Sequence, residues 1–397
     1  MSDKNNKTLK RGWRRVKFGD VVRLSKARSQ NPLTDGFECY VGLEHLEPGD
    51  LRIRTWGNVA DGVTFTSVFQ PGQVLFGKRR AYQRKIAVAD FAGVCSGDIY
   101  VLETKDVQAL LPELLPFICQ TDAFFDHAVG TSAGSLSPRT NWTSLADFEF
   151  SLPPLDEQAR IVMAMAAFDE CFESCRALQA HGNALLQSLL DRMWNSFPLR
   201  KIGALIAGGL IAPPQDGNHG EKHPKASDYI PDGVPFVMAS DLKSGKVDFV
   251  NCSKISESLA RTLRIGFSRS GDVLLSHKGT VGEVARLGEL ATDFVMLTPQ
   301  VTYYRVLDQS RLLPDWLYFA FQTPGFRRLL DQYGKQSTRA YVGITTQREL
   351  SIPVAEVIDQ SQTLAELVAA ENAVSAAALR ASTVAEVRQR LLAEALA

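Results

Sequence analysis

A dense group of basic side chains occupies one short segment of this chain of 397 residues. Five basic residues and no acidic residue occur there around a single tyrosine: Lys78, Arg79, Arg80, Tyr82, Arg84 and Lys85. An arginine guanidinium is a planar fork that pairs with phosphate oxygens and with O6 and N7 of guanine. We interpret this basic turn as a contact for a nucleic-acid backbone and base edge, with a solvated hairpin as the alternative.

The same segment matches a nucleotide-binding loop only in part. Residues 72–78 read GQVLFGK, but Arg79 stands where a serine or threonine would bind magnesium. A helix should follow such a loop, whereas strand-like IAVA follows at 86–89. The sequence therefore argues against NTP binding here.

Three further segments offer small polar groups together with bases. The SHKGT turn at 276–280 stands where a second copy of the basic turn would lie, and two loops follow the short helices predicted at 111–129 and 314–333. Their candidate DNA contacts are His277, Lys278, Thr280, Ser137, Arg139, Asn141, Ser337 and Arg339. Two copies of one module that recognise different DNA sequences would need matching backbones with different side chains at this turn.

The segment PQDGNHGEKH at 214–223 adds a polar, glycine-rich loop. Asp216, Asn218 and His219 are its candidate base-edge contacts. His219 and His223 are four residues apart, but Glu221 is in the wrong order for a zinc protease and the glycines oppose a helix. We predict no metal site and no catalytic set, and the six cysteines show no zinc or disulfide spacing.

A neutral total hides an uneven charge distribution. The segments 155–196 and 355–397 each contain six acids and three bases, so the rest of the neutral chain carries +6. Residues 10–28 hold eight bases against Asp20, which fits either contact with a DNA backbone or a solvated terminal face.

The elements that must position these groups occur twice. Leu111-Pro112-Glu113 is followed 202 residues later by Leu313-Pro314-Asp315, and an offset of 202 also relates Phe124 to Phe326. Near the start of each copy, KFG at 17–19 corresponds to KIG at 201–203. The order of the matches indicates two copies of one module, with insertions in surface loops.

Each copy ends in a long helix with an apolar stripe. Apolar residues recur at intervals of three to four, a spacing that is typical of a coiled coil or helix pair. The predicted packing residues are Ile161, Met165, Phe168, Phe172, Leu189, Leu364, Leu367, Val387 and Leu391. Helices of about 35–40 residues would be roughly 50–60 Å long. We expect them to pack antiparallel, although each helix could instead cover only its own lobe.

These patterns predict an α/β (α+β) chain with two pseudo-repeated lobes joined by two long antiparallel coiled-coil-like helices. The expected parts are a first lobe at 1–152, a first helix at 153–196, a second lobe at 197–352 and a second helix at 353–397. No apolar stretch is long enough for a membrane span and the first residues form no secretory signal, so we expect a cytoplasmic protein.

The chain resembles the specificity subunits of type I restriction-modification systems over nearly its whole length. The resemblance is carried by PLDEQARI at 154–161, PQDGNHG at 214–220, GVPF at 233–236, SDL at 240–242 and GDVL at 271–274. The second helix departs from the pattern, because Val354-Ala355-Glu356 stands where a Pro-Leu pair is usual.

The resemblance implies a non-catalytic DNA reader in which each lobe recognises half of a split, asymmetric target. The helices would hold the half-sites about one DNA turn apart, roughly 34–36 Å. They would also dock two methyltransferase subunits that use S-adenosylmethionine to methylate adenine. A separate motor-nuclease subunit would cleave unmodified DNA.

Two other classes of protein remain as alternatives. A single-chain DNA-modifying enzyme is disfavoured, because the sequence has neither an Asn-Pro-Pro-Tyr nor an Asp-Pro-Pro-Tyr motif, and no glycine-rich loop for S-adenosylmethionine. A protein-protein scaffold would use the helices as its functional surface and leave the lobes inert.

Overall fold

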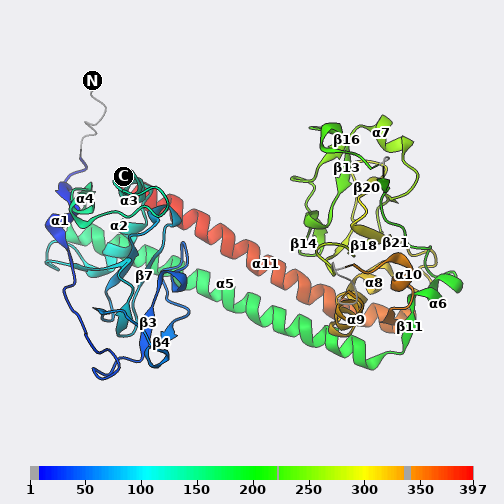
Figure 1. Cartoon of the computed structure of the whole chain (residues 1–397), viewed down its shortest axis with the longest axis horizontal. Helices are drawn as coiled ribbons and strands as arrows, with labels where there is room; N and C mark the ends of the chain where they lie inside the picture. Colours follow the sequence, from blue (N-terminus) through cyan, green and yellow to red (C-terminus); the bar gives the residue numbers. More distant parts are fainter. Residues whose placement is uncertain (1–8, 221–222, 335–340, 397) are drawn as a thin grey trace. The chain divides into compact units, whose positions relative to one another are not determined.

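The structure is a computed structural model that describes residues 9–220, 223–334 and 341–396. The chain divides into two compact units: unit 1 comprises Met1–Cys175 with Leu379–Ala397, and unit 2 comprises Arg176–Ala378. The long helices α5 (Leu155–Ser196) and α11 (Val357–Ala395) each contribute one segment to each unit. Each unit therefore contains a lobe of strands and short helices together with part of a helix pair (Figure 1).

Unit 1 is built on two four-stranded sheets. The first contains, in spatial order, β2 (Val22–Leu24), β9 (Ile99–Thr104), β6 (Val74–Gly77) and β7 (Ile86–Val88), all antiparallel. The second contains β4 (Gly57–Asn58), β3 (Cys39–Val41), β8 (Gly93–Cys95) and β5 (Ser67–Phe69), with β3 parallel to β8. β1 (Arg14–Lys17) and β10 (Glu149–Leu152) pair antiparallel, so the two ends of the lobe meet.

Unit 2 repeats this plan. Its three-stranded sheet contains β19 (Val284–Arg286), β18 (Val273–Ser276) and β21 (Val301–Tyr304). Its five-stranded sheet contains β12 (Tyr229–Ile230), β16 (Lys254–Ile255), β13 (Val234–Val237), β20 (Val295–Leu297) and β17 (Phe267–Ser268), with β13 parallel to β20. The ends of this lobe meet through β11 (Leu199–Lys201) and β22 (Ser351–Pro353), and β14 (Leu242–Lys243) pairs with β15 (Lys246–Val247).

The short helices also recur, and they correct one prediction. Unit 1 has α1 (Phe18–Val21), α2 (Leu115–Gln120), α3 (Asp122–Gly130) and α4 (Trp142–Ala146). Unit 2 has α6 (Ile202–Ala207), α7 (Glu257–Thr262), α8 (Pro314–Ala320), α9 (Pro324–Gly334) and α10 (Ile344–Gln347). A continuous helix over 111–129 was predicted, but Thr121 divides it because its hydroxyl accepts the Phe124 amide and caps α3. Thr323 accepts the Phe326 amide in the same way.

A buried glutamine fastens each long helix to its lobe. The side chain of Gln158 donates to the carbonyls of Ala109 and Pro153 at 3.0 and 2.9 Å and accepts the Leu111 amide at 2.9 Å. Gln360 makes the corresponding three bonds, donating to Arg311 and Ala355 and accepting from the Leu313 amide. The junction of the second helix is therefore built like the first, although a Pro-Leu pair is missing from its sequence.

In unit 2 the two helices pack through small and aliphatic residues. Leu189, Leu364 and Leu367 are buried in the same core, as predicted for the stripe. Gly182 allows a close approach, because a Cβ there would lie 2.8 Å from a methyl carbon of Val374. Antiparallel packing of α5 and α11 is visible within this unit (Figure 1).

In unit 1 the stripe contains a charged residue. Ile161 and Met165 are buried and Phe168 packs against the same core, but Phe172 is only half-buried. Val387 and Leu391 are 42% and 40% exposed, unlike the prediction, whereas Arg388 and Leu392 fill the buried positions. Arg388 is tolerated inside because its Nε lies 2.8 Å from Asp169 and its Nη2 donates to Gln120 at 2.8 Å.

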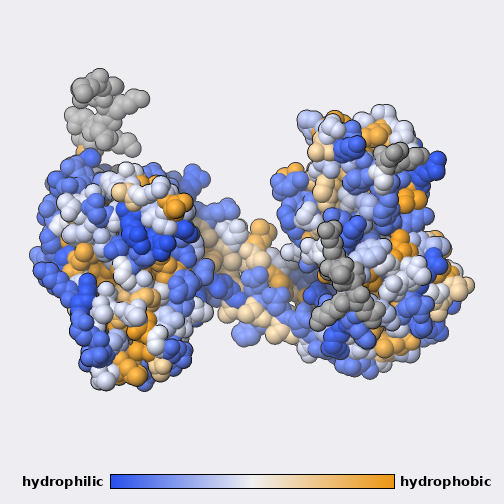
Figure 2. All heavy atoms as spheres, in the orientation of Figure 1, coloured by the Kyte–Doolittle hydropathy of each residue, from blue (hydrophilic) through white to orange (hydrophobic). Residues whose placement is uncertain are grey.

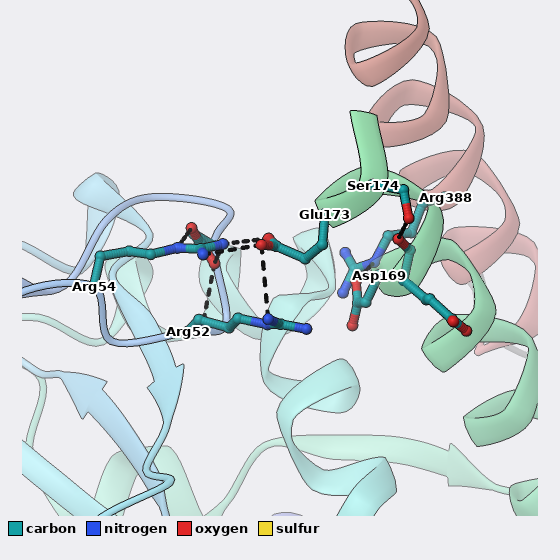
Figure 3. A network of polar contacts seen from close by, with 8 residues as sticks. Arg52, Arg54, Asp169, Glu173, Ser174 and Arg388 are labelled. Carbon is teal, nitrogen blue, oxygen red and sulfur yellow. Dashed lines mark hydrogen bonds and ion pairs between the residues drawn. The ribbon is translucent and has the colours of Figure 1, made fainter. Parts of the chain in front are cut away.

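A loop of unit 1 is attached to α5 by ion pairs (Figure 3). Arg54 donates to Asp50 at 2.9 Å and to Glu173 at 3.0 Å, and Arg52 lies 3.7 Å from the same glutamate. The hydrogen bonds from Arg54 hold the pKa of Glu173 below its ordinary value. Figure 3 also shows Arg388 of α11 beside Asp169 of α5.

Hydrophilic residues cover most of the face shown in Figure 2, with apolar patches between them. None of the helices in the described ranges is both long and apolar enough to cross a membrane.

Candidate nucleic-acid interface

In unit 1 the basic turn follows directly from a buried strand. β6 ends at Gly77, and a 3₁₀ turn at Ala81–Gln83 leads into β7. Arg80 and Arg84 flank this turn with φ values of 54° and 55°, in the left-handed region that costs non-glycine residues energy. The chain thus forms a strand-turn-strand unit here, unlike the strand-loop-helix of a nucleotide-binding loop.

The structure brings this turn together with the predicted loop at 137–141. The amide of Arg80 donates to the Pro138 carbonyl at 2.7 Å, and the Thr140 amide donates to the Lys78 carbonyl at 3.0 Å. Arg79 and Arg139 face each other in an isolated antiparallel bridge. Two segments about 60 residues apart in sequence therefore form one surface.

Two arginines hold one carboxylate on this surface, and two further cations lie beside them. We name Lys78, Arg79, Arg80, Arg139 and Asp98 the basic cluster. Asp98 accepts from Arg139 Nε at 2.7 Å and from Arg79 Nη1 at 3.3 Å. Partial burial disfavours its ionised form, but the hydrogen bonds from both arginines outweigh this and lower the pKa of Asp98. The cluster therefore keeps an excess of positive charge.

The guanidinium groups are oriented by more than Asp98. Ser137 Oγ accepts from Arg79 and Arg80 at 3.0 and 3.3 Å. The ammonium of Lys78 lies 4.7 Å from the centre of the Tyr100 ring. Such fixed guanidinium groups lose less conformational entropy when a phosphate or a base edge binds.

Other predicted contacts of unit 1 have structural partners. Arg84 donates to the Gln120 carbonyl and pairs with Asp122, and Lys85 donates to the Leu43 carbonyl at 2.7 Å. Asn141 caps α4 by accepting the Ser144 amide at 2.8 Å. Tyr82 is 56% exposed on the turn and is free to stack on a base.

Part of the terminal basic run is also paired within unit 1. Arg15 and Lys17 of β1 form ion pairs with Glu149 and Asp147, and Arg23 of β2 pairs with Glu103. These pairs are partly solvent-exposed and link distant segments of the lobe, so this part of the run is paired within the unit.

Unit 2 builds its candidate turn on the same backbone frame. The His277 amide donates to the Gln300 carbonyl at 2.9 Å, and the His277 carbonyl accepts the Val342 amide at 3.0 Å. In unit 1, Lys78 bonds in the same way to the Asp98 carbonyl and the Thr140 amide, both at 3.0 Å. Lys278 and Tyr341 form the bridge that corresponds to the bridge between Arg79 and Arg139.

His277 supports this frame from inside. Its side chain is completely buried, and its Nδ1 lies 2.8 Å from Thr302 Oγ1, which also accepts Gln347 Nε2 at 3.2 Å. His277 Nδ1 and Thr302 Oγ1 therefore share one buried hydrogen bond, whose direction depends on the tautomer of the ring. Nε2 has no hydrogen-bond partner among the described residues and faces Asp216 at 3.8 Å.

Burial keeps His277 neutral. Desolvation lowers its pKa to about 4 despite the opposing field of Asp216, and nearby His219 and Lys278 lower it further. The His277 ring, a predicted DNA contact, lies beneath the surface in this conformation. It can therefore position neighbouring groups but is not itself exposed to a ligand.

The glycine-rich loop of unit 2 lies next to this histidine. Asp216 is buried and lies 2.9 Å from His219 Nε2, whose side chain is 57% exposed. Asn218 is buried, where it donates to the Ile265 carbonyl and accepts the Arg264 amide. We name Asp216, His219, His277 and Lys278 the polar cluster.

Four predicted contacts of unit 2 lie on an exposed turn or outside the described residues. Lys278 and Thr280 lie on the exposed part of the turn. The predicted contacts Ser337 and Arg339 lie outside the described residues. No group of His, Cys, Asp and Glu within the described ranges could hold a metal ion, and the described cysteines are unpaired.

Asp98 and Gln300 also fix the two turns, although the sequence patterns did not predict this. Each precedes the strand that pairs with the turn-bearing strand, and each accepts the amide that begins the turn. Their separation of 202 residues is the offset of the repeat, and this signal could have identified them.

One family model matches the first part of the chain. Residues 10–180 match the family described as "Type I restriction modification DNA specificity domain". The type I restriction enzyme EcoDI specificity subunit of Escherichia coli is 28% identical over 199 residues, which are 47% of this chain and 42% of that protein. The match therefore spans less than half of that relative's length.

Two solved structures match almost the whole chain. The S subunit of a type I restriction-modification system from M. genitalium has a TM-score of 0.64 at 12% identity, covering 99% of this chain and 98% of that one. A chain from a structure of a type I R-M system, solved to explain its assembly and conformational transition, has a TM-score of 0.56 at 20% identity and covers 98% of each chain. These likenesses confirm the predicted α/β (α+β) fold class. The family match and the curated relative confirm the resemblance to type I specificity subunits.

Proposed function

We propose that this chain is the DNA sequence-specificity subunit of a type I restriction-modification complex. Unit 1 reads one half of a bipartite, asymmetric target through the basic cluster, and unit 2 reads the other half through the exposed part of the polar cluster. The chain itself is non-catalytic and acts in the cytoplasm. The similarity of residues 10–180 to DNA specificity domains supports this proposal.

The observation that carries the proposal is one backbone frame with two sets of side chains. Lys78 and His277 occupy the same position and make the same two backbone hydrogen bonds. The residues around them differ in charge, size and hydrogen-bonding groups. A reader of two unlike half-sites needs a common scaffold and different base-edge contacts, because base edges specify sequence and phosphates mainly position the protein.

The long helices set the half-site spacing and dock the partner subunits. Both helices expose large apolar residues outside their buried stripes: Met163, Leu178, Leu185, Ile358, Leu379, Val387 and Leu391. Apolar side chains held on rigid helices suit a protein partner. We propose two methyltransferase subunits, which would bind S-adenosylmethionine, and a motor-nuclease subunit.

Methylation-sensitive sequencing of host DNA with and without this gene tests the proposal. Deletion should remove adenine methylation from one split motif with a fixed gap. If the methylome is unchanged while the partner methyltransferase is expressed, the chain is not the specificity subunit of that system, and a scaffold role is favoured.

A further inference from the structure

An anchored hairpin beside the basic cluster carries an apolar residue at its tip. Ala133 and Arg139 exchange two backbone hydrogen bonds of 3.0 Å, which close a loop of five residues at 134–138. Gly134 turns the chain with a φ of +112°, a region that favours glycine. The base of the loop is fixed to the basic turn through Arg79 and Arg139.

Leu136 lies at the centre of this loop and is 89% exposed. Its neighbour Ser137 accepts hydrogen bonds from Arg79 and Arg80, so the leucine stands next to two guanidinium groups. Exposed leucines are common on protein surfaces, but this one stands on a hairpin that is fixed at its base and lies beside two arginine side chains. The loop can therefore present its apolar tip at a defined place.

The neighbouring cations indicate what covers this tip. Arg79 and Arg80 both keep a buried Nε without a hydrogen-bond partner among the described residues. The basic cluster contains four cations and a single carboxylate, which pairs with Arg79 and Arg139, so the surface favours a polyanion. Proteins that hold a duplex by its phosphates and also insert an apolar side chain between base steps unstack and kink the DNA.

We propose that Leu136 is an apolar wedge that enters the base stack of the half-site read by unit 1. The guanidinium groups beside it hold the flanking phosphates, and the hairpin keeps the leucine directed at one base step. This inference rests on the proposed function and adds a second source of specificity. Steps that unstack easily, such as TA and CA, are favoured at that place even without a base-edge hydrogen bond.

Fluorescence of 2-aminopurine tests the wedge. The full chain, purified with the subunits that accompany it, is mixed with duplexes that carry the methylated motif and one 2-aminopurine at successive positions. One position in the unit 1 half-site should brighten severalfold on binding, because 2-aminopurine is quenched by stacking. Leu136→Ala should abolish this increase and weaken binding on the order of tenfold, whereas Leu136→Phe should retain the increase.

Leu33→Ala is the matched control, because Leu33 is also exposed, at 61%, in the loop between β2 and β3 of unit 1. It should change neither fluorescence nor affinity. A complex that binds tightly without brightening any position overturns the wedge, as does brightening that Leu136→Ala retains in full or that Leu33→Ala also abolishes. Absence of binding to the motif by the wild-type complex would instead overturn the proposed function.

Discussion

At the end of β6, Lys78 is partly exposed above the ring of Tyr100, whereas at the end of β18, His277 is completely buried beneath its turn. The backbone around both residues makes the same hydrogen bonds. In unit 1, guanidinium groups and Asp98 hold the surface together. In unit 2, neutral hydrogen bonds from Thr302 and Gln347 do so from inside.

This difference shows that the frame does not depend on the chemistry that it presents. The frame is fixed by backbone hydrogen bonds that both units make, while the side chains on and beneath it differ. Unit 1 carries charge that is constant over the physiological pH range, and unit 2 contains an interior histidine that must remain neutral. The two clusters should therefore respond differently to substitution, pH and salt.

The largest effects should come from the buried glutamine at the junction between each lobe and its long helix. Gln158→Leu in unit 1 and Gln360→Leu in unit 2 each leave one amide and two carbonyls without their partner. Each variant should lose about 3 kcal/mol or more of stability in its own unit, because buried polar groups without hydrogen bonds are costly. Hydrogen exchange resolved by unit measures this loss.

Gln187→Leu is the control, because Gln187 is exposed on α5. It should leave the exchange of both units unchanged. If the unit that carries one of the two glutamine substitutions is as well protected from exchange as in wild type, the two helix junctions are not equivalent. The structural correspondence between the units would then not extend to their stability.

Acidification should separate the two units. His277 has a folded pKa of about 4 against an ordinary value of 6.5, so its stabilising effect is complete above pH 6.5 and is lost as the pH falls towards 4. The loss is on the order of 3 kcal/mol. Asp98 has a lowered pKa, so its contribution is lost only below its ordinary value of 3.8.

Hydrogen exchange at pH 7 and pH 5 measures this order of events, with unit 2 weakening first. His277→Gln should flatten the dependence of unit 2 on pH, at some cost in stability. His181→Gln should not, because His181 is exposed on α5. Equal weakening of both units in wild type would show that the buried histidine does not set the difference.

Much of the fold was predictable because it depends on periodicity and order. The repeat, the strands around the basic turn and both long helices follow from apolar spacing, and the PLDEQARI segment places Gln158 at the start of the first helix. The matching role of Gln360 was hidden, since its neighbours Val354 and Ala355 differ from the usual pair while its own three bonds are kept.

The site was less predictable, because tertiary contacts decide which polar groups reach the surface. Arg84 and Lys85 belong to a basic run, but their partners Asp122 and Leu43 come from distant segments. The stripe of α11 was misplaced at its end, since an arginine in a buried position cannot be recognised without its partner Asp169. Single-sequence patterns do not contain such pairings.

The basic cluster should carry the strongest DNA contacts of unit 1. Arg79→Gln with Arg139→Gln should weaken binding by roughly 2 kcal/mol, reduce the slope of log affinity against log salt by about 2, and relax preference in one half-site. Arg160→Gln is the control, because Arg160 is exposed on α5 beside Glu157. Titration at several salt concentrations against duplexes altered in either half-site measures both effects. If the sequence preference in both half-sites is unchanged, the basic cluster contacts phosphates and reads no base.

The smallest effect should come from Lys278, which lies exposed on the corresponding turn of unit 2. A lysine is a point charge without the fork that recognises base edges, so Lys278→Gln should weaken binding by about 1 kcal/mol or less and reduce the salt slope by about 1. Its sequence preference should stay the same, because the base-edge contacts of unit 2 are assigned to its other polar groups. The same duplex series measures this. A change of preference in the second half-site would show that Lys278 reads a base, and the two turns would then resemble each other in chemistry as well as in frame.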